Sequence, residues 1–129
     1  MKDILLDTHA LLWFFNGDEK LSLTARRVIN NENHKKIVSV ASLWEITIKI
    51  SLGKLEFTGG INGILKLIDE NGFEIISIFP SHIIQLEKLS SYHKDPFDRI
   101  LIATAISEDM EIVSIDENFK LYNGLQLIW

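Results

Sequence analysis

Four acidic residues recur at the same kind of place in the apolar pattern of the chain, where a predicted strand ends or a predicted helix begins. They are Asp7, Glu45, Asp98 and Asp116. Asp7 directly follows the apolar run Ile4–Leu6, and Asp116 directly follows the run Ile112–Ile115. Carboxylate oxygens are the ligands that hard divalent cations prefer. If the fold brings these acids together, they could hold Mg²⁺ or Mn²⁺.

Each of these acids also has a purely structural interpretation when it is considered alone. Ser42 and Glu45 match a helix capping box, and Asp98 would interact favourably with the N-terminus of its own helix. Asp7 and Asp116 are typical turn residues. Four clustered carboxylates, however, repel one another, and the sequence shows no cluster of lysine or arginine to neutralise them. The combination therefore predicts a bound divalent cation.

The apolar pattern predicts alternating strands and helices. Strands are expected at residues 4–6, 36–39, 73–78, 112–115 and 125–128. Helices are expected at residues 8–15, 23–31, 42–53, 61–70, 82–89 and 97–107. This alternation predicts an α/β fold whose mainly parallel central sheet is covered by helices on both faces. Ligands bind beyond the carboxyl ends of the strands in such sheets, and right-handed crossovers would bring the four acids to that edge.

The composition is that of an ordinary folded protein. The chain has 129 residues, of which 47% are hydrophobic and 24% are charged, and it is expected to form one domain over residues 1–129. It contains no cysteine, which excludes disulfides, thiolate catalysis and thiolate-bound zinc. The net charge of −5 argues against a protein that coats nucleic acid through charge alone. An enzyme that contacts nucleic acid through bound cations stays possible.

The apolar opening of the chain resembles a targeting segment only superficially. Asp3 and Asp7 interrupt it, and no small-residue cleavage site follows. No apolar run approaches the length that a membrane span requires. We therefore expect a cytoplasmic protein that does not enter the membrane.

Four segments occur in an order and spacing that cover nearly the whole chain: ILLDTHALLW, SVASLWEITIKISLGKL, DPFDRILIATAI and IVSIDENF. In these segments the chain resembles the PIN-domain ribonucleases, and among them the VapC-like toxins of type II toxin–antitoxin pairs. The resemblance implies a three-layer α/β/α sandwich and the Mg²⁺- or Mn²⁺-dependent hydrolysis of RNA phosphodiester bonds. The four acids of the family correspond to Asp7, Glu45, Asp98 and Asp116, and its small hydroxyl residue corresponds to Ser114.

The resemblance also implies roles and partners. Asp7 and Asp98 are expected to be direct metal ligands. Glu45 would be a further ligand or a water-mediated partner, and Asp116 would position metal-bound water. The expected partners are an RNA substrate, a cognate antitoxin that places a basic side chain across the acidic site, and a second copy in a homodimer. The homodimer is expected partly because the run LLWFF at residues 11–15 offers more apolar surface than one helix usually buries.

Other polar residues are expected to have structural roles. Asp95 and Pro96 are expected to begin the helix that contains Asp98, because Asp is a good N-cap and Pro fits the first helical turn. Arg99 is expected to pair with a neighbouring carboxylate, and Lys49 to be solvated. Ordinary surface or partly buried roles are expected for the histidines, which lack the spacing of metal ligands: His9, His34, His82 and His93.

Two other functions fit part of the pattern. A response-regulator receiver also binds Mg²⁺ through aspartates at strand ends, but it would have an acidic pair after the first strand, where this chain has Asp7 followed by Thr8. A PIN-like module that binds RNA or protein without turnover would not need all four acids. A metal-dependent nuclease assay of the wild type and an Asp7→Asn variant would distinguish these functions.

Overall fold

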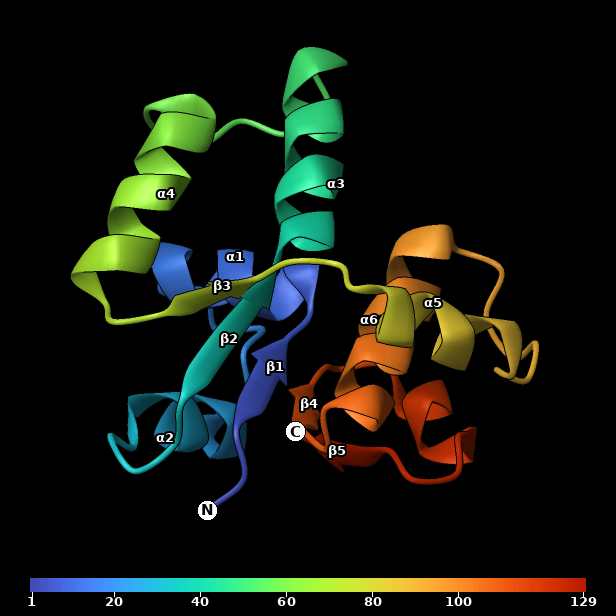
Figure 1. The fold of residues 1–129 in the computed structure, drawn as a ribbon. Helices are drawn as coiled ribbons and strands as arrows, with labels where there is room; N and C mark the ends of the chain where they lie inside the picture. Colours follow the sequence, from blue (N-terminus) through green and yellow to red (C-terminus); the bar gives the residue numbers. More distant parts are fainter.

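A parallel sheet of five strands organises the chain in the computed structural model, which describes residues 1–129 (Figure 1). The strand order is β3-β2-β1-β4-β5, and every neighbouring pair is parallel. The strands are β1 (Ile4–Leu6), β2 (Lys36–Ser39), β3 (Glu74–Ile76), β4 (Glu111–Val113) and β5 (Gln126–Ile128). Because the strand order reverses between β1 and β4, their carboxyl ends form the topological switch point of the sheet.

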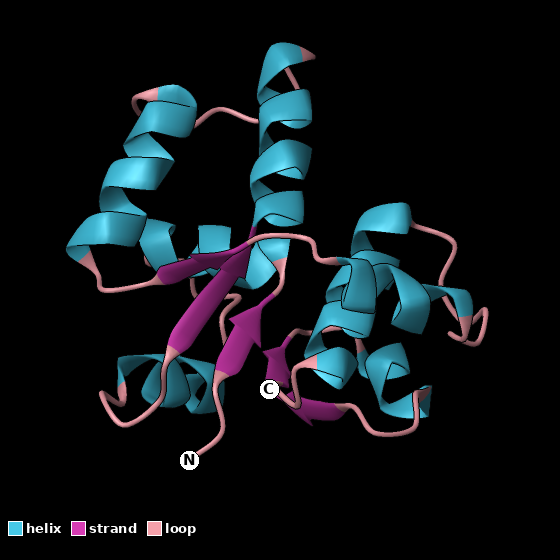
Figure 2. Ribbon diagram, in the orientation of Figure 1, coloured by secondary structure: helices cyan, strands magenta, loops and turns pink.

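Helices flank the sheet on two sides, as Figure 2 shows. They are α1 (Thr8–Asn16), α2 (Leu23–Asn30), α3 (Val40–Ser51), α4 (Gly60–Glu70), α5 (Pro80–Glu87), α6 (Pro96–Ser107) and the 3₁₀ helix η1 (Glu117–Leu121). Side chains of β1 alternate between two separate cores: Ile4 and Leu6 pack with helices α1 to α4, whereas Leu5 packs with α6 and η1. The predicted three-layer α/β/α architecture is confirmed. None of the helices combines the length and apolar character needed to cross a membrane.

The order of the predicted strands and helices is confirmed, but α3 and α5 each begin two residues earlier than expected. The N-cap of α3 is Ser39, whose hydroxyl accepts a hydrogen bond from the backbone N–H of Ala41 at 3.0 Å. Ser42 therefore lies inside α3, and the predicted capping box between Ser42 and Glu45 is wrong. The short helix η1 was not predicted.

The aromatic-rich run at residues 11–15 lies within α1 and packs inward. Leu11 and Leu12 are buried, and the rings of Phe14 and Phe15 pack edge-on against Phe73, with centroid distances of 5.9 and 5.6 Å. The run therefore contributes to the core of this chain, while Trp13, Phe14 and Phe15 stay partly exposed. The homodimer stays a prediction.

Candidate functional site

The four predicted acids gather around the switch point of the sheet. Asp7 follows β1 and Asp116 follows the end of β4, while Glu45 projects from α3 and Asp98 from the first turn of α6. The charges of Asp7 and Glu45 both act on Asp98 and raise its pKa. Asp98 also lies close to Asp116, with carboxylate oxygens within 4.8 Å of one another. The structure thus brings together acids that are far apart in the sequence.

Asp7 and Glu45, here called the inner carboxylates, are 6% and 9% exposed. Asp7 is the N-cap of α1, and its Oδ1 accepts a hydrogen bond from the backbone N–H of Ala10 at 2.8 Å. Burial raises the pKa of Asp7, the Ser114 hydroxyl and the Ala10 N–H oppose this, and the charge of Glu45 raises the pKa further. A cation placed beside Asp7 would therefore stabilise its ionised form.

Glu45 is held by side chains of α1 and α3. The Thr8 hydroxyl donates to Oε1 of Glu45 at 2.6 Å and lies 3.1 Å from the Ser42 hydroxyl. Because a hydroxyl carries one proton, Ser42 donates to Thr8 in this chain of hydrogen bonds. The Nζ of Lys49 lies 3.1 Å from Oε2 of Glu45. Lys49 is therefore not simply solvated, as the sequence suggested, and it partly neutralises this carboxylate.

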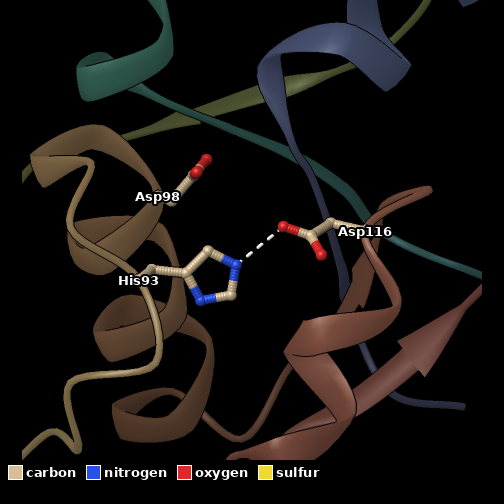
Figure 3. A group of neighbouring side chains, drawn as sticks. All are labelled: His93, Asp98 and Asp116. Carbon is tan, nitrogen blue, oxygen red and sulfur yellow. Dashed lines mark hydrogen bonds and ion pairs between the residues drawn. The ribbon is translucent and has the colours of Figure 1, made fainter.

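His93, Asp98 and Asp116 form a second group, here called the outer cluster, whose possible ligand atoms all lie within 4.8 Å of one another. Figure 3 shows the His93 ring directed at the Asp116 carboxylate, with Asp98 above them on its own helix. The Nε2 of His93 lies 2.7 Å from Oδ2 of Asp116. The other oxygen of Asp116 caps η1 by accepting from the Asn118 N–H at 2.9 Å. Asp116 is thus fixed from two sides.

Asp98 connects the inner carboxylates to the outer cluster. Its pKa is raised from 3.8 to about 6, mainly by burial and next by the charge of Asp95. His93 lowers this pKa, whereas Asp7 and Glu45 raise it. The charges of both regions of the site therefore act on Asp98. When it is ionised, the positive groups of the chain do not fully neutralise its charge.

His93 is the site residue that the sequence analysis missed. Its backbone oxygen accepts a hydrogen bond from Nη1 of Arg99 at 3.1 Å, and the same guanidinium also bonds the carbonyls of Leu89 and Ser90. Arg99 therefore anchors the loop that carries His93, and the prediction that it pairs with a carboxylate is wrong. The contact between His93 and Asp116 spans 23 residues of sequence. No local pattern could have revealed it.

The donor atoms of the site fit a divalent cation. The possible ligand atoms that lie within 4.8 Å of one another belong to His93, Asp98 and Asp116, while Asp7 and Glu45 lie near enough for their charges to act on Asp98. Lys49 is the one lysine or arginine that forms an ion pair with any of these acids. Oxygen-rich sites suit Mg²⁺ and Mn²⁺, whereas an imidazole suits the later first-row transition metals. His93, Asp98 and Asp116 could therefore hold one cation together, and direct ligation by Asp7 or Glu45 stays a prediction.

Comparison with known proteins gives three similar results. Residues 4–125 match the PIN domain family. The chain is 25% identical over 121 residues to Ribonuclease VapC22 of Mycobacterium tuberculosis, which covers 93% of this chain and 92% of the relative. Its fold matches that of VapBC2 from Rickettsia felis, solved bound to a promoter DNA fragment, with a TM-score of 0.76, 17% identity and 96% of each chain covered.

The fold also matches that of a second protein from Mycobacterium tuberculosis. That protein is VapC20, described as a toxin that cleaves the sarcin–ricin loop, and its structure matches with a TM-score of 0.67 and 12% identity. The match covers 96% of this chain and 99% of VapC20. At these identities the solved structures support the fold.

Proposed function

Because the chain belongs to the PIN domain family, we propose that it is a metal-dependent ribonuclease that hydrolyses RNA phosphodiester bonds. One observation carries the proposal: Asp98 connects both groups of acids at the switch point of the sheet. It belongs to the outer cluster, and the charges of the inner carboxylates raise its pKa. The similarity to Ribonuclease VapC22 supports the same activity. Membership of the PIN family excludes the receiver-like alternative that the sequence left open.

The chemistry follows from the donor atoms. A Mg²⁺ or Mn²⁺ ion in this site would supply the positive charge that polarises a phosphodiester and activates water. We propose that Asp7 and Asp98 hold the ion directly, because burial and repulsion from neighbouring carboxylates raise the pKa of both. Thr8 fixes the orientation of Glu45, and Asn118 and His93 fix that of Asp116. Residues held in this way lose little entropy when they take part in catalysis.

We further propose that the chain acts as one domain and as the toxin of a toxin–antitoxin pair in the cytoplasm. Support comes from the VapBC complexes among the similar structures, including that of VapBC-1 from Haemophilus influenzae. The antitoxin would place a guanidinium across the acidic site and displace the cation. Raising the Mg²⁺ concentration should then weaken inhibition by the antitoxin. If inhibition were indifferent to Mg²⁺ and to loss of Asp7 and Asp98, blockage of RNA at another surface would be the better account.

Self-association is a separate proposal. A homodimer is expected from the resemblance to VapC-like toxins, and sedimentation at micromolar concentration tests it directly. A strictly monomeric chain across that range would contradict it. The proposed nuclease activity would be unaffected by that outcome, because all the acids come from one chain.

A nuclease assay tests the main proposal. RNA cleavage by the purified chain should require Mg²⁺ or Mn²⁺, stop with a chelator, and fall at least about 100-fold in Asp7→Asn. Asn is also a good N-cap, so this variant keeps the start of α1 and should remain folded. A folded wild-type chain that binds RNA but never cleaves it, with any divalent metal, would instead support the non-catalytic binding module.

A further inference from the structure

His93 brings a nitrogen donor to a site that otherwise consists of oxygen donors. Its Nε2 lies 2.7 Å from Oδ2 of Asp116, and both atoms lie within 4.8 Å of a carboxylate oxygen of Asp98. Two ligands at adjacent corners of an octahedral ion are about 3.0 Å apart when the bonds are about 2.1 Å long. The three side chains could therefore surround one ion after small movements.

The imidazole is held in place by its surroundings. The side chain of His93 is 9% exposed, and its ring packs against Phe119 and Tyr122 with centroid distances of 4.8 and 5.5 Å. Arg99 fixes the backbone carbonyl of the same residue. A ring restrained by two aromatic neighbours and through its backbone loses little conformational entropy on binding a ligand. His93 is thus more rigid than a surface histidine such as His34.

The hydrogen bond between Nδ1 of His93 and Tyr122 is compatible with both neutral tautomers of the imidazole. Nδ1 lies 2.8 Å from the hydroxyl of Tyr122, and a hydroxyl can either donate or accept. When Nε2–H donates to Asp116, Nδ1 accepts from Tyr122. In the other tautomer Nδ1–H donates to Tyr122, and the lone pair of Nε2 is free to bind a metal ion. Histidines that bind metals commonly donate their other N–H in this way.

We propose that His93 is a metal ligand and that, with Asp98 and Asp116, it makes a mixed nitrogen and oxygen site that prefers Mn²⁺ and Co²⁺ to Mg²⁺. Mg²⁺ strongly prefers oxygen, whereas imidazole nitrogen suits the transition metals. The proposal deepens the metal dependence proposed above by assigning a ligand and a metal preference. It does not require that the bound RNA or its cleavage be known.

Pulsed electron paramagnetic resonance on the Mn²⁺-loaded chain tests the ligand directly. The wild type should show hyperfine coupling from a directly bound ¹⁴N. His93→Gln should lose that coupling, while its side-chain amide can still donate to Asp116. His34→Gln is the matched control, because His34 contacts the backbone oxygen of Lys2 and is remote from the acids in the sheet. It should keep the wild-type signal.

Calorimetric titration with Co²⁺ and Mg²⁺ provides the second readout. His93→Gln should weaken Co²⁺ binding at least about 10-fold and change Mg²⁺ binding by less than about threefold. Tyr122→Phe, which keeps the aromatic ring, should weaken Co²⁺ binding by a smaller factor. This variant also serves if His93→Gln does not fold. Equal losses for the two metals would overturn the proposal and would make His93 a residue that only positions Asp116.

Absence of ¹⁴N coupling in the wild type would also overturn the proposal, even if Mg²⁺-dependent RNA cleavage were intact. In the converse case, ¹⁴N coupling without any RNA cleavage would support the ligand assignment and contradict the proposed function. The two experiments therefore separate the failure of one proposal from the failure of the other.

Discussion

The inner carboxylates and the outer cluster reach the same site by different means. Asp7 is placed by its neighbours in sequence, since it ends β1 and caps α1 through the Ala10 N–H. His93 and Asp116 are placed by contacts between segments that are distant in sequence. Asp7 therefore needs only β1 and α1 to be placed, whereas the outer cluster, and Glu45 through its bond to Thr8, need contacts between distant segments.

The two regions also differ in what neutralises their charges. Glu45 has Lys49 and the Thr8 hydroxyl as partners, and both oxygens of its carboxylate are engaged. The pKa of Asp98 is raised by burial and by the charges of Asp95 and the inner carboxylates, and His93 offsets part of this rise. This difference indicates that Glu45 is already paired, whereas Asp7 and Asp98 have raised pKa values and no lysine or arginine partner.

The largest expected effect is the loss of nuclease activity when Asp98, which connects the two regions, is replaced. Asp98→Asn should lower RNA cleavage at saturating Mg²⁺ at least about 100-fold, because it removes a charge that both regions share. Asp95→Asn is the matched control at the same helix start, since Asn keeps the N-cap. It should retain most of the activity in a single-turnover assay. Comparable activity in the two variants would show that Asp98 has only a structural role.

The next effect is on stability and concerns the inner region. Thr8→Val removes the hydroxyl that donates to Glu45 at 2.6 Å and leaves a buried carboxylate oxygen without this partner. The free energy of unfolding should fall by about 1–3 kcal/mol in urea titration. Thr8→Ser keeps the hydroxyl and should lose less. If Thr8→Val proved as stable as Thr8→Ser, this hydrogen bond would not stabilise the inner region.

A smaller effect is the contribution of Asp98 to the pH dependence of stability. The pKa of Asp98 is about 6 in the folded chain against an ordinary 3.8, so the folded chain binds more protons than the unfolded chain between these values. The stability of the metal-free protein should therefore fall as the pH rises from about 4 to about 6, and stay lower above that range. After allowance for partial exposure, Asp98 should account for about 1 kcal/mol of this loss.

Thermal unfolding at several pH values, with a chelator present, measures this dependence. Asp98→Asn should reduce the slope between pH 4 and 6 and raise the melting temperature at pH 7. Buried Asp7 acts in the same direction, so some slope should remain. A lower melting temperature for Asp98→Asn at pH 7 would mean that Asp98 mainly stabilises the N-terminus of α6.

The smallest effect is expected from the one ion pair of the inner region. Lys49→Met removes the positive charge 3.1 Å from Glu45. Because the Lys49 side chain is 36% exposed, solvent screens this pair, and it should contribute less than about 1 kcal/mol to stability. Divalent metal should bind a few-fold more tightly at low salt, because a competing cation is gone. Calorimetric titration at two salt concentrations would show the gain shrinking with screening. Weaker metal binding in Lys49→Met would contradict this account of Glu45.

The sequence predicted most of the fold because the signals for it are local. Asp95 accepts from the backbone N–H groups of Phe97 and Asp98, as expected of the N-cap before Pro96. The strands are short, the central strand β1 is fully apolar, and the alternation with helices predicted their parallel pairing. The acids at strand ends followed from this topology.

What the sequence did not predict depends on contacts between distant segments. Ser42 and Glu45 matched a capping box, but the N-cap of α3 is Ser39. The side chains of Ser42 and Glu45 instead form hydrogen bonds with the Thr8 hydroxyl. Arg99 bonds three carbonyls of a loop, because it faces the backbone there and no carboxylate. His93 joined the site through tertiary packing. Its role could be found only once the loop and η1 were placed.

Calorimetric titration of the metal-free chain with Mn²⁺ is the most direct test of the claim that both regions form one metal centre. The wild type should bind Mn²⁺. Binding should weaken at least about 10-fold in Asp7→Asn, which alters the inner region, and in Asp116→Asn, which alters the outer one. The double variant Asp7→Asn/Asp98→Asn should show little binding. Equal Mn²⁺ affinity in the wild type and this double variant would contradict the account.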